Sequence, residues 1–292
     1  TVMRRFCRRI HPKVSGRLVD TCGTGGDLIK TFNVSTTSAF VAAGAGVAVA
    51  KHGNRSVTSR CGSADVLETL GLDLKTDPQV VERAIEQVGI GFMFAPNFHP
   101  AMKHAIGPRR EVGLRTVFNL LGPLTNPANA DAQLIGVYDH SMTEPIAHVL
   151  RNLGSREAMV VHGLDGLDEI STIGKTRITW LKDGDISSKE LNPEDLGLRR
   201  GAPELLEGSD PHESAKITFN ILCGSGGDSS KRDMVLANSA AAIIIGGKAE
   251  DFTEAVSLAE SSIDTGSAYE KLRSLIRLCG DISKLEEFES HG

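Results

Sequence analysis

The chain has 292 residues, a formal net charge of −5 and 40% hydrophobic residues, which is the composition of a globular protein with a sizeable core. It contains no apolar run long enough to span a membrane and no secretory signal, and its acidic charge and 4% of aromatic residues argue against a nucleic-acid partner. Its five cysteines lack the spacing of a zinc site or a CxxC motif, which predicts reduced thiols in a cytoplasmic protein.

The densest chemical pattern runs from Asp20 to Glu68. An apolar lead ends at Asp20, and the glycine-rich run 23–27 (GTGGD) follows. Glycine carries no Cβ and adopts positive φ at little cost, so a bulky anion can touch several backbone N–H groups there. The pattern predicts a strand followed by a phosphate-binding loop.

A helix is expected to begin at Asn33, Ser35 and Thr36 and to continue through the apolar run 39–43. A helix N-terminus offers N–H groups and a favourable dipole to a phosphate, and Ser or Thr hydroxyls add donors or bind magnesium. The run 47–50 predicts a short buried strand that delivers Lys51 to its end, where an ammonium group suits a phosphate.

A structural alternative exists for each of these features. A glycine-rich turn alone is more often a loop than a site, and Lys51 alone would be a solvated surface residue. Two strand ends that both carry phosphate-type residues within one supersecondary unit favour the binding site.

Further elements follow from apolar periodicity and capping signals. Helices are expected from Asp77–Pro78 to Gly89, in two parts split by Pro108 over 102–121, from a Ser141/Glu144 capping box to Leu153, over 213–222, over 232–245, after Asp251 with Glu254, and over 268–278 as a peripheral last helix. Strands are expected over 91–95, 133–138 and 158–162, with a hairpin of 176–181 and 185–191. Residues 96–100 should break the pattern as a hinge, and 223–228 should be a connector rather than a second phosphate loop.

Asp168 and Glu169 form the second candidate constellation, in a segment that follows the strand ending at His162. Most adjacent acidic pairs are solvated turn residues. Placement after a strand end, together with a phosphate site elsewhere in the chain, favours magnesium, which combines carboxylates with substrate phosphates and waters.

Several motifs in this order resemble the anthranilate phosphoribosyltransferases, which belong to the nucleoside phosphorylase-like class. The similarity runs from about Leu18 to the C-terminus, and the motifs are GTGGD (23–27), TFNVST (31–36), KHGNR (51–55), GSADVLE (62–68), GIGFMFAPNFHPAMKH (89–104), RTVFNLLGPLTNP (115–127) and VVHGLDGLDEIS (160–171). Many family members have a glycine where this chain has Leu28-Ile29-Lys30, which makes Lys30 a further candidate phosphate contact.

The resemblance implies an α/β fold. A large domain (17–97 and 127–292) would hold a central, mainly parallel sheet flanked by helices, beside a small discontinuous all-helical domain (1–16 and 98–126). Family members usually carry several helices before the position of Thr1, so we expect the small domain to be incomplete here. They usually dimerise through it, which predicts a weakened homodimer with exposed apolar surface near 2–10 and 117–121.

The resemblance also assigns individual residues. It places 5-phosphoribosyl pyrophosphate on Gly23, Thr24, Gly25, Gly26, Asp27, Thr31, Asn33, Ser35, Thr36, Lys51, His52, Gly53, Asn54 and Ser63. It places anthranilate on Gly23, Asn54, His99 and Arg109. It places two Mg²⁺ ions on Ser35, Asp168 and Glu169. His99 could instead be a packed or hinge histidine, and Arg110 rather than Arg109 could face the cleft.

The implied reaction transfers phosphoribose from 5-phosphoribosyl pyrophosphate to the amine of anthranilate. An aryl amine is neutral and nucleophilic at pH 7, so we assign no general base. The alternatives are a pyrimidine nucleoside phosphorylase-like enzyme, whose base-reading motif is not visible, and a non-catalytic nucleic-acid-binding relative, which should show basic stripes and degraded substrate motifs.

Overall fold

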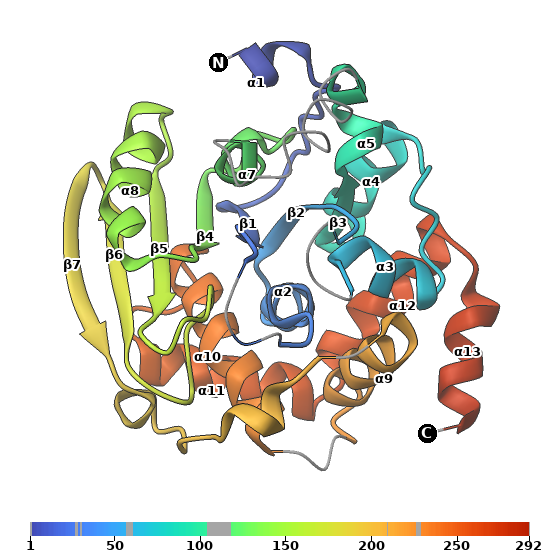
Figure 1. The fold of residues 1–292 in the computed structure, drawn as a ribbon. Helices are drawn as coiled ribbons and strands as arrows, with labels where there is room; N and C mark the ends of the chain where they lie inside the picture. Colours follow the sequence, from blue (N-terminus) through green and yellow to red (C-terminus); the bar gives the residue numbers. More distant parts are fainter. Residues whose placement is uncertain are drawn as a thin grey trace.

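Seven strands form one sheet in a computed structural model that describes residues 2–26, 29, 31–56, 61–103, 118–208, 210–225 and 229–291. The strand order is β3-β2-β1-β4-β5-β6-β7 (Figure 1). The first five strands in this order run parallel: β3 (Ile90–Phe94), β2 (Ala48–Gly53), β1 (Leu18–Gly23), β4 (Ala132–Gly136) and β5 (Glu157–Gly163). The antiparallel pair β6 (Thr176–Lys182) and β7 (Asp185–Leu191) completes it. The expected α/β fold with a mainly parallel sheet is confirmed.

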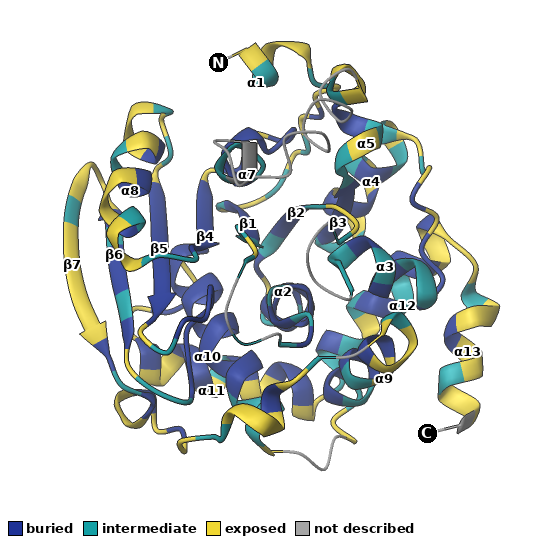
Figure 2. Ribbon diagram, in the orientation of Figure 1, coloured by how far each residue is buried: buried dark blue, intermediate teal, exposed yellow. Residues whose placement is uncertain are grey.

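Helices cover the sheet on both faces. The described α-helices are α1 (Val2–Phe6), α2 (Val34–Gly44), α3 (Ser63–Thr69), α4 (Pro78–Val88), α5 (Ala95–Phe98), α7 (Phe118–Leu121), α8 (Thr143–Asn152), α9 (Pro211–Leu222), α10 (Ser229–Ile245), α11 (Phe252–Asp264), α12 (Ser267–Cys279) and α13 (Ile282–His291). Side chains alternate along each strand, so Val19 and Val49 join the large core with α2 and α10, while Leu18 and Ala50 face the opposite side. Figure 2 shows that α2 is mostly buried, and in α10 the buried part runs from Met234 to Ile245.

Local signals explain several element ends. Asp77 accepts a hydrogen bond from the Gln79 N–H (2.8 Å) at the start of α4, and Gly89 ends the helix with φ of +93°. The β6–β7 hairpin turns through Asp183 and Gly184, whose φ angles of +50° and +94° match a two-residue turn of the left-handed kind. These ends are where the sequence predicts them.

The expected capping box at Ser141 is wrong. The Asp139 carboxylate accepts hydrogen bonds from both the N–H (2.9 Å) and the hydroxyl (2.8 Å) of Ser141. A 3₁₀ turn over His140–Met142 results, and α8 begins only at Thr143. Because the Ser141 hydroxyl is used as a donor to Asp139, it does not cap the helix.

Helix α12 is neither last nor peripheral, contrary to expectation. Leu272, Leu275 and Ile276 are buried in the large core, and α12 packs against α2 and α4. Helix α13 follows it. Residues 96–100 also differ from expectation, because α5 and a 3₁₀ turn over Pro100–Met102 form there; the hinge stays a prediction.

The N-terminal segment lies against the segment that follows β3. The Arg8 N–H donates to the Phe98 carbonyl (2.8 Å), and the Arg4 Nε donates to the Leu124 carbonyl (2.8 Å). Only 2–6 is helical, and Ile10 is buried, so the apolar surface expected over 2–10 is restricted to Val2 and Phe6. The division into domains stays a prediction. Within the described ranges, no helix has both the length and the apolar character needed to span a bilayer.

The burial of α12 generates a stability prediction. Leu272→Ala should lower the free energy of unfolding by roughly 2–5 kcal/mol, because removing most of a fully buried side chain leaves a cavity in the core. Leu278→Ala, on the same helix but 37% exposed, should cost well under about 1 kcal/mol. Urea unfolding of both variants decides this, and equal losses would contradict the buried position of α12.

Candidate active site

Four adjacent parallel strands each end at a glycine: β1 at Gly23, β2 at Gly53, β4 at Gly136 and β5 at Gly163. A Cβ on any of them would overlap a neighbouring group: Asp168 at Gly23 and Gly136, Ser63 at Gly53, and Asp165 at Gly163. The carboxyl ends of parallel strands share one edge of the sheet, the usual place for a ligand in an α/β fold. The motifs that follow β1, β2 and β5 therefore meet at this edge.

The glycine loop leaves β1 with left-handed backbone at Gly25 (φ +67°) and Gly26 (φ +91°), as a phosphate-type loop requires. Thr24 ties the loop to the end of β4. Its N–H donates to the Gly136 carbonyl (2.9 Å), and its hydroxyl accepts from the Tyr138 N–H (3.2 Å). The loop is thus held over two neighbouring strand ends.

Helix α2 begins one residue after Asn33, as predicted. Asn33 does not cap it through its side chain; its Nδ2 donates to the Cys61 carbonyl (3.3 Å) instead. The Thr36 hydroxyl is buried and makes no hydrogen bond within the described ranges. Thr31 pairs with Glu207 in an isolated bridge before the helix. An unsatisfied buried hydroxyl in the first turn of a helix leaves a donor for a ligand.

Lys51 lies inside β2 rather than at its end, and only 2% of it is exposed. Its Nζ donates to the Thr21 carbonyl (2.6 Å) and lies 3.4 Å from the Ser35 Oγ. Burial lowers the pKa of Lys51, while the negative charges of Asp20 and Glu169 act to raise it. Both the strand-end placement and the surface alternative are therefore wrong: the ammonium group lies beneath the start of α2.

Asp20 is a buried charge to which the sequence assigned no role. Its Oδ1 accepts from the His52 N–H (3.1 Å), and its Oδ2 has no hydrogen-bond partner among the described residues. Burial raises the pKa of Asp20 to about 6. The available signal was an acidic residue inside an otherwise apolar strand, which is unusual without a function or a partner.

His52 and His99 are stacked at a tilt, with ring centroids 5.0 Å apart. Burial lowers the pKa of His52 to about 3, and it also lowers the pKa of His99, so both imidazoles are neutral at pH 7. The Nε2 atom of each ring is buried without a partner in the described part of the chain. Residues predicted for two different substrates are thus in contact.

Asn54 and Ser63 are brought together just beyond β2. The Ser63 hydroxyl donates to the Asn54 carbonyl (3.3 Å), which also accepts from the Ala64 N–H (3.2 Å) at the start of α3. A Cβ at Gly53 would overlap the Ser63 hydroxyl. The segment after β2 therefore packs tightly on α3.

The predicted acidic pair reaches the glycine loop. Asp168 and Glu169 are 6% and 8% exposed, so neither is a solvated turn residue. The Gly25 N–H donates to the Asp168 Oδ2 (2.8 Å), a contact between residues 143 positions apart. A Cβ at Gly23 would overlap the Asp168 carboxylate, and one at Gly136 would overlap its backbone carbonyl.

The arrangement fits magnesium. Both carboxylates are buried, that of Asp168 contacts the glycine loop, and the charge of Glu169 acts on Lys51, which contacts the Ser35 hydroxyl. Over the described ranges, no cluster of three or more His, Cys, Asp or Glu side chains could form an all-protein cage. Mg²⁺ commonly takes one or two carboxylates and completes its shell with water and substrate phosphates. Asp27, Lys30, Arg109 and Arg110 lie outside the described residues.

Comparisons with known proteins agree with this geometry. Residues 15–269 match the family described as "Glycosyl transferase family, a/b domain". The anthranilate phosphoribosyltransferase of Desulfosudis oleivorans is 54% identical over 274 residues, which cover 94% of this chain and 80% of that protein. The enzyme of the same name from Syntrophobacter fumaroxidans is 56% identical over 275 residues, with coverages of 94% and 81%.

The chain belongs to the anthranilate phosphoribosyltransferase family. A crystal structure of the Thermus thermophilus member has a TM-score of 0.89 at 42% identity and covers 95% of this chain and 82% of its own. The Saccharomyces cerevisiae member, solved with PRPP and Mg, has a TM-score of 0.85 at 32% identity, with coverages of 95% and 77%. These family members share the fold found here.

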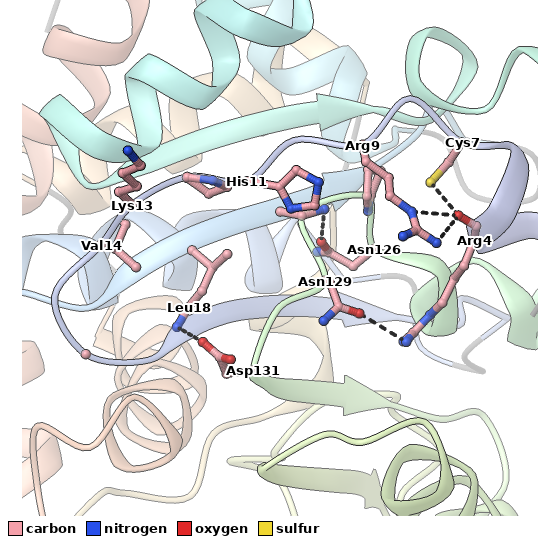
Figure 3. Close-up of a pocket in the computed structure, with 14 residues that line it drawn as sticks. Arg4, Cys7, Arg9, His11, Lys13, Val14, Leu18, Asn126, Asn129 and Asp131 are labelled. Atoms are coloured by element: carbon pink, nitrogen blue, oxygen red, sulfur yellow. Dashed lines mark hydrogen bonds between the residues drawn. The ribbon is translucent and has the colours of Figure 1, made fainter.

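This family member also has a cavity of about 630 Å³ away from the candidate site, near the amino ends of β1 and β4 (Figure 3). Leu18 donates its N–H to the Asp131 carboxylate (3.0 Å) on one wall, and Arg4 donates to the Asn129 side chain (3.3 Å) on another. None of the predicted site residues lines this cavity. This cavity is therefore separate from the candidate site.

The buried Asp20 generates a pH prediction. Its pKa is about 6 in the native state and about 4 in an unfolded chain, so the native state alone retains the proton between pH 4 and pH 6. This makes the native chain less stable as pH rises through that window. Relative to it, Asp20→Asn should gain stability, on the order of 2–3 kcal/mol, between pH 4 and pH 6 and then level off.

Urea unfolding at several pH values measures this difference, with Asp139→Asn as a control of opposite sign. Hydrogen bonds from Ser141 lower the pKa of the exposed Asp139, so the stability that it contributes is lost as pH falls. Asp139→Asn should lose stability relative to the native chain as pH rises. Parallel curves for Asp20→Asn and the native chain would contradict the assignment.

Proposed function

We propose that this protein transfers the phosphoribosyl group of 5-phosphoribosyl pyrophosphate to the amine of anthranilate, giving N-(5-phosphoribosyl)anthranilate and pyrophosphate in tryptophan biosynthesis. Family membership supports this activity. Relatives have been solved with PRPP and Mg and with 4-fluoroanthranilate. The observation that carries the proposal is the hydrogen bond from the Gly25 N–H to Asp168, which joins a phosphate-type loop to a buried acidic pair.

The phosphoribosyl site is proposed along the carboxyl edge. Those of its predicted residues that the structure describes fall mainly in three groups: residues 23–26 after β1, the first turn of α2, and residues 51–54 with Ser63. The Thr36 hydroxyl supplies an unsatisfied donor, and Lys51 supplies positive charge from beneath. In a mainly dissociative transfer, charge builds on the departing pyrophosphate, so fixed donors and cations at that end stabilise the transition state.

Asp168, Glu169 and Ser35 are proposed to hold magnesium, and we extend this to two ions. When bound, magnesium would neutralise charge on the leaving pyrophosphate. The protein's part is to keep two carboxylates buried and oriented beside the glycine loop, so that little reorganisation is needed as substrate binds.

Anthranilate is proposed to bind beside the histidine pair. His52 and His99 are neutral, and each has a buried Nε2 atom without a partner among the described residues, which suits an aromatic amine rather than a second anion. Asn54 follows His52 by two residues, directly after β2. Gly23 and Arg109 complete the proposed anthranilate set.

A pyrimidine nucleoside phosphorylase-like activity is the alternative enzyme. Its base-reading motif is not visible, and the substrate-type motifs of the transferase are present. Incubation with anthranilate, 5-phosphoribosyl pyrophosphate and Mg²⁺, followed by product fluorescence, tests the proposed activity. Turnover only with phosphate and nucleosides would overturn it.

Homodimer formation and a cytoplasmic location are further parts of the proposal. Val2 and Phe6 of α1 are 70% and 62% exposed, and apolar side chains on such a helix suit a subunit contact. All five cysteines are free thiols, as expected of a reducing compartment. Sedimentation of this chain over a range of concentrations measures whether it dimerises.

Removal of the acidic pair should abolish turnover. In Asp168→Asn with Glu169→Gln, magnesium loses both carboxylates, and the rate at limiting Mg²⁺ should fall by at least about 10²-fold while circular dichroism stays native. The surface pair Glu286→Gln with Glu287→Gln on α13 is the matched control. Full activity of the Asp168/Glu169 variant at limiting Mg²⁺ would exclude the metal assignment.

Arg109→Ala should raise the KM for anthranilate and leave the KM for 5-phosphoribosyl pyrophosphate nearly unchanged. The planar guanidinium suits the anthranilate carboxylate, and losing one partner of such a pair costs about 2–5 kcal/mol. The carboxylate is present in ground and transition states, so the loss should fall mainly on KM. Arg110→Ala is the neighbouring control. A defect in Arg110→Ala alone would shift the assignment by one residue.

A further inference from the structure

Asn238 lies in the middle of α10 and is fully buried. It makes two hydrogen bonds to the backbone of a single residue in the segment 163–171, which we call the acidic loop. Its Oδ1 accepts from the Ile170 N–H (2.9 Å), and its Nδ2 donates to the Ile170 carbonyl (3.0 Å). The other hydrogen on Nδ2 is donated to the Met234 carbonyl (2.9 Å), one turn earlier in α10. Ile170 directly follows Glu169, so Asn238 holds the peptide next to the acidic pair.

A polar side chain in an apolar helix requires an explanation. Ala237, Ser239, Ala240 and Ala241 around it are buried as well, and an asparagine there is costly unless its groups are satisfied. Here both amide hydrogens and the oxygen have partners, and two of the three bonds go to the loop rather than to α10. Asn238 therefore binds the loop through both the oxygen and the nitrogen of its side-chain amide.

The loop is closed independently at its other side. The Asp165 carboxylate accepts from the Ser171 hydroxyl and from the Leu167 N–H (3.3 Å), and the Ser171 oxygen accepts from the Ile173 N–H (2.9 Å). These contacts define the shape of the turn but do not attach it to any helix. Asn238 attaches it to α10 by two hydrogen bonds, beside the packing of Leu167 and Ile170 in the large core.

Helix α10 also contacts the helix whose first turn contributes to the proposed phosphoribosyl site. The Ser38 hydroxyl of α2 donates to the Val235 carbonyl (3.3 Å), and the Ser239 hydroxyl donates to the Ser38 carbonyl (3.5 Å). Asn238 and Ser239 are adjacent, so one turn of α10 holds both the acidic loop and α2. The distance between the acidic pair and the start of α2 is therefore fixed by a single rigid element.

We propose that Asn238 is a positioning residue for magnesium: through Ile170 it fixes Asp168 and Glu169 relative to the first turn of α2. This rests on the proposed assignment of the acidic pair to magnesium. Outer groups that orient metal-binding carboxylates commonly change metal affinity by about 10–100-fold when they are removed. Without the Asn238 hydrogen bonds, the loop would keep its internal Asp165–Ser171 contacts but would be held less firmly relative to α2.

The test compares the native chain with Asn238→Ala and Asn238→Asp. The aspartate has the same shape and still accepts from the Ile170 N–H, so it keeps a folded chain available for measurement if the alanine variant does not fold; when ionised it cannot donate to the Ile170 carbonyl. Ser262→Ala is the control, because the buried Ser262 hydroxyl on α11 donates to the Val41 carbonyl of α2 (2.8 Å) away from the loop. Asp168→Asn with Glu169→Gln serves as the reference for complete loss.

Mn²⁺ binding is measured by water proton relaxation with 5-phosphoribosyl pyrophosphate present and anthranilate absent. Melting temperatures and steady-state kinetics accompany it. We expect both Asn238 variants to raise the apparent Kd for Mn²⁺ and the half-saturating Mg²⁺ concentration by about tenfold or more. The KM for anthranilate should stay within about twofold. Ser262→Ala should lower the melting temperature while its Mn²⁺ affinity stays native.

Native Mn²⁺ affinity in Asn238→Ala with a melting temperature as low as that of Ser262→Ala, or in folded Asn238→Asp at a pH where the aspartate is ionised, would overturn the proposal and leave Asn238 a structural residue. The Asp168/Glu169 variant tests the magnesium assignment separately from the role of Asn238. If the Asp168/Glu169 variant itself binds Mn²⁺ like the native chain, the metal assignment fails, whatever the Asn238 variants do.

Discussion

The close crossing of the acidic loop over the ends of β1 and β4 is the constraint on which the site depends. Gly23 and Gly136 end those strands, and any side chain there would displace Asp168. With the glycines in place, the Gly25 N–H reaches the Asp168 carboxylate, and the phosphate-type loop and the acidic pair become one surface. Two motifs that are far apart in the sequence are therefore joined by one backbone-to-side-chain hydrogen bond at the edge of the sheet.

Charge at this edge is held in the protein interior rather than presented from the surface. Lys51 and Asp20 are buried in adjacent strands with their side chains on opposite faces of the sheet, and each shifts the other's pKa toward the charged form. In a low-dielectric setting such fixed charges act strongly on a bound anion, and their positions change little during a reaction. The neutral histidine pair lies on the Asp20 face, so the two faces of the sheet offer different electrostatic environments.

Strong local periodicity made the parallel strands, α4 and the hairpin predictable from the sequence. Asp77 with Pro78, and Asp183 with Gly184, are signals that act within a few residues. Errors arose where a distant or competing contact decides the outcome. The Ser141 hydroxyl donates to Asp139, and α12 is buried because it packs against α2 and α4.

The same distinction holds for the site. Motifs located the glycine loop and the acidic pair, because their residue types match phosphate and magnesium chemistry. Three features depend on contacts between strands and helices far apart in the chain: the burial of Lys51, the unsatisfied Asp20 oxygen and the hydrogen bonds of Asn238 to Ile170.

The β6–β7 hairpin has a different consequence. Strand β7 ends the sheet with Asp185, Lys189 and Glu190 exposed, and charged side chains on an open edge oppose pairing with a strand of another molecule. The hairpin thus protects a hydrophobic parallel sheet from edge-to-edge aggregation.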